Sequence, residues 1–426
     1  MTPPAQPQVD DLVKQVRTRC HDRIQSLHGT MPLWGIDHWV PLGGLVVDVN
    51  ILESDRSSRR SELDDLWQDF TTNNSNYRSF NRIGLGRERE RVSGLTVLER
   101  NTNLLVVGKP GSGKTTYLQS IVTKCNDGKL QSQRIPVLIK LREFIDDGRK
   151  FEYNLERFLE HLWQLSSSDL KLVLDRGLAL LLLDGLDEVV GEVGKQINQQ
   201  IERFARVYPQ SQIVATARTQ IQESPFARFD YVEVADFNKY QIEAFSIHWF
   251  KAVCSNKKEG ELKSREFLRQ LFRAESDAIR TLTITPILLS LTCAVFYRTG
   301  KFYTKRSQLY KEGLNLLLEC WDKSREVEPD KIYRDLSLDR KLELLSYVAA
   351  KKFEQDRYVL FGREELERCI GGFLGIEQRE SQIVLREIQS QHGLLVERAE
   401  QVWSFSHLTF QEYLTARWLV MLDKPS

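Results

Sequence analysis

The residues with the clearest chemical potential form the run GKPGSGKT at 108–115. The run matches the phosphate-binding pattern G-x-x-x-x-G-K-[ST], and it lies between an apolar stretch and a segment with helical spacing. Glycines let backbone N–H groups fold around phosphate oxygens, and the start of a helix adds the positive end of its dipole. The pattern predicts that Lys114 reaches the phosphates and that the Thr115 hydroxyl binds Mg²⁺. The residues expected around a bound nucleotide are Gly108, Lys109, Pro110, Gly111, Ser112, Gly113, Lys114, Thr115 and Thr116.

An acidic cluster follows a second apolar run, in LALLLLDGLDEV at 178–189. A buried strand that ends in Asp184 would deliver a carboxylate to the edge of a sheet where Mg²⁺ lies beside a phosphate loop. Asp187 or Glu188 could then orient or deprotonate an attacking water. Alone, such a cluster is typical of a solvated helix start. Downstream of a phosphate loop it favours a Walker B site.

An arginine ends a third strand-like run, QIVATAR at 212–218. Arg218 could be a surface arginine at the end of a strand. The interpretation we favour is a sensor of the γ-phosphate, because a guanidinium can report charge by forming or losing a bidentate contact.

Short apolar runs separated by helix-length segments should position these side chains. Such alternation predicts a mostly parallel sheet with helices on both faces, which is the core of a P-loop NTPase. The runs expected to be strands are 103–108, 135–140, 178–184, 212–217 and 231–235.

The regions on either side of this core have a different pattern of apolar residues. Residues 238–390 show helical spacing almost throughout, and 392–406 give two strand-like runs before a last helix, which is a winged-helix pattern. At the N-terminus, 10–28 predicts a helix and 31–52 predicts short strands or a hairpin. The expected domains are a small N-terminal α+β region at 1–80, the nucleotide-binding domain at 81–236, a helical domain at 237–330 and a winged helix at 331–426.

Composition excludes some classes of partner. The 426 residues carry a net charge of +1, so no global field draws the chain to nucleic acid or to a membrane surface. No signal peptide or membrane span is evident, and the six cysteines show no C-x-x-C pair, so we expect a cytoplasmic protein with free thiols. Cys20, His21, His28 and His38 lack zinc-site spacing and are interpreted as packed or surface residues.

Taken together, the motifs resemble the NACHT domain of STAND-class P-loop NTPases, in a bacterial, notably cyanobacterial, form related to NOD-like receptors. The resemblance covers roughly residues 80–420. It rests on the phosphate loop, on LLLLDGLDE and ATAR, on the Thr-Pro of TITPILLSL, and on FSHLTFQEYLTA near the C-terminus.

The resemblance implies further roles for two residues. Pro286 would pack on the nucleotide base. Its position is also explained by helix structure alone, because proline is favoured in the first turn of a helix, and both explanations can hold together. His407 would contact the β-phosphate of ADP from the winged helix. In this family ADP holds the domains closed, and exchange for ATP opens them and permits assembly. Relatives usually continue beyond the winged helix into a sensor array or a further helical domain, so we expect that this chain is either a truncated form or senses its trigger elsewhere.

Three functions are compatible with these motifs. The first is a nucleotide-controlled signalling switch that binds ATP with Mg²⁺, hydrolyses it slowly and forms a homo-oligomer when triggered, in antiphage defence or stress signalling. The second is a continuously cycling remodelling or motor ATPase, for which neither a trans-acting arginine nor a substrate grip is identifiable. The third is a nucleotide-binding scaffold that does not hydrolyse, which the intact DGLDE argues against.

Overall fold

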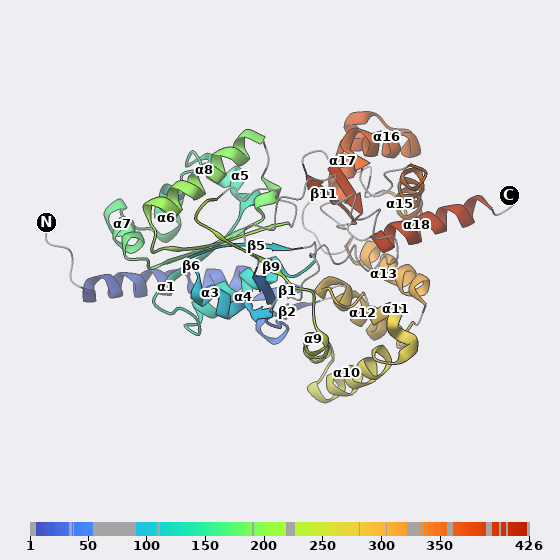
Figure 1. The fold of residues 1–426 in the computed structure, drawn as a ribbon, viewed down its shortest axis with the longest axis horizontal. Coiled ribbons are helices and arrows are strands. Elements are labelled where there is room, and N and C mark those ends of the chain that lie inside the picture. The colour runs from blue at the N-terminus through green and yellow to red at the C-terminus, as the bar shows by residue number, and fades with distance from the viewer. Residues whose placement is uncertain are drawn as a thin grey trace. The chain divides into compact units, whose positions relative to one another are not determined.

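The chain forms two compact units, whose elements are drawn in Figure 1. Met1–Thr30 with Val46–Phe237 form the first unit, and Met31–Leu45 with Asn238–Ser426 form the second. The computed structural model describes residues 6–33, 36, 38–53, 91–108, 111–189, 191–218, 226–280, 282–303, 305–321, 333, 335–355, 361–388, 394–399, 402–405 and 408–423. Within these ranges, no helix is both long and apolar enough to cross a lipid bilayer.

A seven-stranded sheet forms the centre of the first unit. Five neighbouring strands, which make up one side of the sheet as far as its edge, are parallel, as the apolar runs predict. Two strands from earlier in the chain extend it, because β3 (Asn50–Glu53) pairs antiparallel with both β9 (Asp230–Val234) and β4 (Arg91–Ser93). Part of the predicted N-terminal α+β region therefore belongs to the sheet of the nucleotide-binding core. Across the sheet the order is β4 (Arg91–Ser93), β3 (Asn50–Glu53), β9 (Asp230–Val234), β5 (Asn103–Gly108), β8 (Gln212–Arg218), β7 (Ala179–Asp184) and β6 (Ile135–Lys140).

Helices cover both faces of this sheet, and along the parallel strands alternate residues enter one of two cores (Figure 1). On β7, for example, Leu181 and Leu183 face one core while Leu180 and Leu182 face the other. Burial on both faces explains why these strands read as continuous apolar runs. The first core is covered by α5 (Leu141–Arg149), α6 (Leu155–Trp163), α7 (Ser167–Asp175) and α8 (Gly191–Val207), and the second by α3 (Gly94–Arg100) and α4 (Lys114–Asn126).

The predicted N-terminal helix is present as α1 (Gln6–His28), and it is part of the first unit. It lies against the edge strand β6 and against α4. Val13 and Val16 enter the first core and Ile24 enters the second, so α1 contributes to both faces of the sheet at this edge.

From Asn238 the second unit continues as a series of helices, and its core is rich in aromatic rings. Phe250, Phe267 and Phe296 meet edge to face or tilted, with ring centroids 5.5–5.9 Å apart. A short strand from the N-terminal region, β2 (Trp39–Pro41), which pairs with β1 (Thr30–Pro32), contacts the first of these helices. The helices are α9 (Lys239–Val253), α10 (Lys257–Leu271), α11 (Asp277–Arg280), α12 (Pro286–Thr299) and α13 (Arg306–Trp321).

The rest of the second unit has the winged-helix architecture. The predicted two-stranded wing is β11 (Leu395–Ala399) with β12 (Val402–Phe405), and the structure adds a third strand, β10 (Phe361–Gly362), on the other side of β12. The last helix of the chain, α18 (Leu408–Leu422), packs along α15 (Leu338–Phe353), and the rings of Tyr347 and Trp418 are in contact. The helices are α15 (Leu338–Phe353), α16 (Arg363–Leu374), α17 (Gln378–Glu387) and α18 (Leu408–Leu422).

Candidate functional site

The phosphate loop joins β5 to α4, and its described glycines have the backbone freedom that such a loop needs. Gly111 and Gly113 lie in the left-handed region, with φ of 74° and 95°. A Cβ atom on Gly108 would lie 2.7 Å from the hydroxyl of Ser112, so the turn leaves no room for a side chain there. Lys109 and Pro110 lie outside the described residues.

Two polar side chains of this loop could contact an anion. Lys114 Nζ donates to the carbonyl oxygen of Gly108 at 2.7 Å, which holds the ammonium group over the loop. Ser112 is 4% exposed, and its hydroxyl oxygen has no hydrogen-bond partner in the described part of the chain. An orphaned buried hydroxyl is costly, and a phosphate oxygen would satisfy it. Thr116 is half-buried in the first turn of α4.

Tyr117 anchors the first turn of α4 to the backbone at Gly94. Its phenol donates to the carbonyl oxygen of Gly94 at 2.6 Å, and the N–H of Gly94 donates to Val49 at 2.8 Å. Burial, with a smaller effect of the Asp48 carboxylate, raises the pKa of Tyr117, so the phenol stays a hydrogen-bond donor. A Cβ on Gly94 would lie 2.8 Å from the Tyr117 ring. This close contact positions α4, and with it Lys114.

Asp184 ends β7 beside the start of α4, as predicted. Its Oδ2 accepts a hydrogen bond from Thr115 Oγ1 at 2.8 Å, although these residues are 69 positions apart in the chain. Its Oδ1 accepts a second bond, from Thr216 Oγ1 at 2.6 Å. The predicted metal ligands Thr115 and Asp184 are therefore together at one edge of the sheet.

Thr216 was not predicted from the sequence. It lies on β8, which pairs in parallel with β7 so that Leu183 is in register with Ala215. Thr216 is 1% exposed. Side chains alternate along the strand, and Val214 belongs to the core covered by α4 while Ala215 and Ala217 belong to the other core. Thr216 therefore lies on the same face of the sheet as Val214. The available signal was one hydroxyl in an apolar strand, just before the predicted strand end.

The remaining predicted catalytic residues lie near this edge in the backbone. Gly185, with φ of 85°, turns the chain into the 3-10 helix η3 (Leu186–Glu188), which contacts β8. Asp187 is half-buried there, and the side chain of Glu188 is not described. The backbone of Arg218 is in register with Gly108, at the start of the phosphate loop, and its side chain is also not described.

The two residues assigned through the resemblance are placed differently. Pro286 is the first residue of α12 in the second unit, where a missing N–H has no cost. His407 lies outside the described residues, immediately before α18. Both contacts with nucleotide stay predictions.

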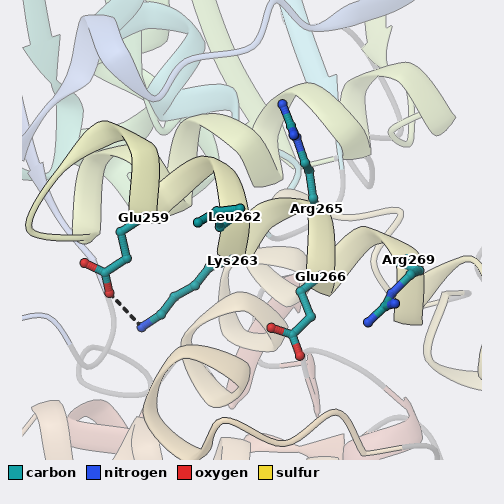
Figure 2. Close-up of a pocket in the computed structure, with 6 residues that line it drawn as sticks. All are labelled: Glu259, Leu262, Lys263, Arg265, Glu266 and Arg269. Atoms are coloured by element: carbon teal, nitrogen blue, oxygen red, sulfur yellow. Dashed lines mark ion pairs between the residues drawn. The ribbon is translucent and has the colours of Figure 1, made fainter.

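Two surface hollows lie elsewhere. One, of about 560 Å³, lies over α10, and Figure 2 shows Lys263 paired with Glu259 there while Arg265 points away from that pair. The other, of about 680 Å³, lies beside α1. Each is lined by side chains of both signs, and neither includes a residue of the phosphate loop.

The arrangement fits a nucleotide with Mg²⁺. Lys114 and Ser112 would hold phosphate oxygens, and Thr115 with Asp184 would hold the metal, which keeps several waters and therefore needs few protein oxygens. Bound Mg²⁺ neutralises charge that develops on the phosphates. The chain's own contribution would be to bind and orient the phosphates at the junction between β5 and α4.

Known families match this chain in two regions. The model of the NACHT domain matches residues 102–253, and the model of the winged helix-turn-helix domain C-terminal to NACHT matches residues 306–419. A search of curated proteins gives no match.

Solved structures with similarity include three archaeal proteins. The Walker-type ATPase of Pyrococcus abyssi is 15% identical, covering 74% of this chain and 92% of that chain, with a TM-score of 0.34. The Orc1 protein of Aeropyrum pernix, solved in complex with DNA, is 14% identical, covering 75% of this chain and 88% of that chain, with a TM-score of 0.36. A Signal Transduction ATPase with Numerous Domains (STAND) protein with a tetratricopeptide repeat sensor from Pyrococcus horikoshii is 14% identical, covering 80% and 46%, with a TM-score of 0.30.

The two family models match in chain order, and the residues of the first include the phosphate loop, Asp184 and most of a parallel sheet. The chain therefore carries a NACHT domain, of the P-loop NTPase class, followed by the winged-helix domain that lies C-terminal to NACHT.

Proposed function

We propose that this protein is a nucleotide-controlled switch that binds ATP with Mg²⁺, hydrolyses it slowly and rests with ADP bound. The observation that carries the proposal is the 2.8 Å contact between Thr115 and Asp184, which brings the predicted metal ligands of two separate motifs together. The match of a NACHT-associated winged helix in the same chain supports a second module that responds to the nucleotide.

In this proposal each part of the site has a distinct task. Lys114 and Ser112 bind phosphate, while Asp187 or Glu188 orients the attacking water. Arg218 distinguishes ATP from ADP by contacting the γ-phosphate, because a guanidinium that loses its anionic partner favours another arrangement. Pro286 packs on the base.

The switch requires differential affinity. A ligand shifts two conformations only by the difference in its affinities for them, and a change from 1:99 to 99:1 needs roughly a 10⁴-fold difference. We assign the ADP-preferring contact to His407. His407→Ala should then raise the ADP dissociation rate by about tenfold or more, measured with a fluorescent ADP analogue. An unchanged rate would remove His407 from the proposal.

The proposal extends to assembly and biological setting. ATP-bound chains would form a homo-oligomer in the cytoplasm after a trigger binds, in antiphage defence or stress signalling. The cysteines at 20, 125, 254, 293 and 369 are free thiols, which is consistent with a reducing compartment. Survival of phage-challenged cells that carry the wild-type chain or Lys114→Ala tests the defence setting.

Steady-state turnover and assembly distinguish the switch from a motor. The switch should hydrolyse ATP far more slowly than about 1 per second without a trigger, and it should change its mass distribution between ADP and a non-hydrolysable ATP analogue. Asp184→Asn, which keeps the size of the side chain, is the control for site-dependent hydrolysis. Untriggered turnover of several per second, lost in Asp184→Asn, would instead identify a cycling ATPase. Nucleotide binding without any product in a single-turnover assay would identify a scaffold.

A further inference from the structure

Thr216 connects two consecutive residues at the end of the neighbouring strand. Its hydroxyl donates to Asp184 Oδ1 at 2.6 Å and accepts from the N–H of Gly185 at 3.0 Å. The 3-10 turn that carries the candidate catalytic acids begins directly after this point.

The direction of the Thr216 hydrogen is fixed by these two bonds. A threonine hydroxyl has one donor hydrogen and acceptor lone pairs. Because the N–H of Gly185 can only donate, it occupies a lone pair of Thr216, and the single hydrogen points to the Asp184 carboxylate. A neutral donor to a carboxylate forms a strong, short bond, and burial of Thr216 protects it from water.

The two oxygens of Asp184 differ in what surrounds them. Oδ1 is held by a buried residue of an adjacent strand, whereas Oδ2 contacts Thr115, which is exposed on the first turn of α4. The Thr115 side is the side of the phosphate loop. A carboxylate held at one oxygen cannot rotate freely, so its other oxygen stays directed toward that side.

We propose that Thr216 is a positioning residue that fixes Asp184 through Oδ1 and so presents Oδ2 to the Mg²⁺ of a bound nucleotide. Residues that orient metal ligands typically change metal affinity by 10–100-fold when they are replaced. The inference rests on the proposed binding of nucleotide with Mg²⁺, and it adds a residue to which no role was assigned.

The test uses the full chain and measures binding, not turnover. Fluorescent ADP is bound to each variant while free Mg²⁺ is titrated, and binding is measured again in excess EDTA. Thr216→Val keeps the branched shape without the hydroxyl, and Thr216→Ser keeps the hydroxyl. We expect Thr216→Val to raise the Mg²⁺ concentration for half-maximal binding by about tenfold, with unchanged affinity in EDTA, and Thr216→Ser to stay within about threefold of wild type.

Ser211→Ala provides a matched control. Ser211 precedes the same strand, is fully buried, and donates to the carbonyl oxygen of Leu174 at 3.0 Å. Its loss should lower the thermal unfolding temperature without moving the Mg²⁺ titration. Thr216→Ala is a second hydroxyl-free variant in case Thr216→Val does not fold.

Two results would overturn the inference. One is a wild-type Mg²⁺ dependence in a folded, hydroxyl-free variant. The other is a Thr216→Ser variant as impaired as Thr216→Val, which would assign the effect to the lost methyl group. Wild-type protein that binds no nucleotide at any Mg²⁺ concentration would contradict the proposed function itself and is recognised before any variant is compared.

Discussion

The two ends of α4 are held in different ways. At the N-terminal end, left-handed glycines, an exposed Thr115 and a Ser112 hydroxyl without a hydrogen-bond partner among the described residues leave polar groups open toward a ligand. At the C-terminal end, side chains of α1 satisfy the last carbonyl groups. Arg17 Nη2 donates to Cys125 and Asn126 at 2.7 and 3.3 Å, and Arg17 Nη1 donates to the Arg134 carbonyl group.

Further contacts complete the C-terminal end. Asn126 donates to the carbonyl oxygen of His21 at 3.1 Å, and Gln25 donates to Asp127 at 2.6 Å. A guanidinium at this end also complements the negative pole of the helix dipole, while the positive pole at the other end is left for phosphate. The comparison indicates that one end of α4 is built for stability and the other for binding, so changes at the two ends should have separable effects.

The largest effect is expected at the N-terminal end, from Lys114→Ala. Loss of the ammonium group should lower ATP affinity by more than about 100-fold, because the charge that faces the phosphates is removed. The thermal unfolding temperature of the nucleotide-free protein should change little. Isothermal titration calorimetry measures the affinity, and retained binding would contradict the assignment of the site.

A pH effect on stability should also follow from α1. His28, in the last turn of α1, is 7% exposed, and burial, with a smaller effect of Lys140, lowers its pKa from 6.5 to about 4. Because the folded-state pKa is the lower one, the unfolded chain takes up the proton first. Stability is then fully present above about pH 6.5 and is lost as the pH falls toward 4, by up to about 3 kcal/mol.

Denaturant unfolding at several pH values measures this loss. The control is His28→Leu, which cannot titrate and should show a smaller decrease between pH 6.5 and pH 4. Parallel curves for the two proteins would exclude His28 as the cause.

Arg17→Ala should have a smaller effect of about 2 kcal/mol on unfolding, because it removes the guanidinium that donates to the carbonyl groups of Cys125 and Asn126 at the end of α4. Nucleotide affinity of the folded variant should change by less than about threefold if the two ends are separable. Arg23→Ala removes the same charge from an exposed position of α1 and should be nearly neutral. A large loss of affinity in Arg17→Ala would show that the ends are coupled.

Local patterns were sufficient to predict the centre of the first unit. The apolar runs gave the parallel strands, and the spacing of the motifs placed Thr115 beside Asp184, because both lie at strand or helix ends on one edge of a sheet. Nonlocal pairing was not predictable in the same way. The apolar face of α1 shows that it is buried but not against what, and β3 is too short to reveal that it joins β9.

Thr216 was missed for a different physical reason. Threonine is common in strands because its branched side chain suits them, so one threonine carries little signal until the register with β7 is known. The roles of Arg218 and His407 depend on side chains outside the described residues and stay predictions.

The nucleotide that copurifies with the full chain tests the central claim most directly. Protein purified without added nucleotide is denatured, and the released compounds are separated by ion-exchange chromatography and quantified against protein concentration. A resting switch with the site described above predicts close to one ADP per wild-type chain and none from Lys114→Ala. Wild-type chains that carry no nucleotide, and that also bind neither ADP nor ATP when it is added with Mg²⁺, would contradict the account.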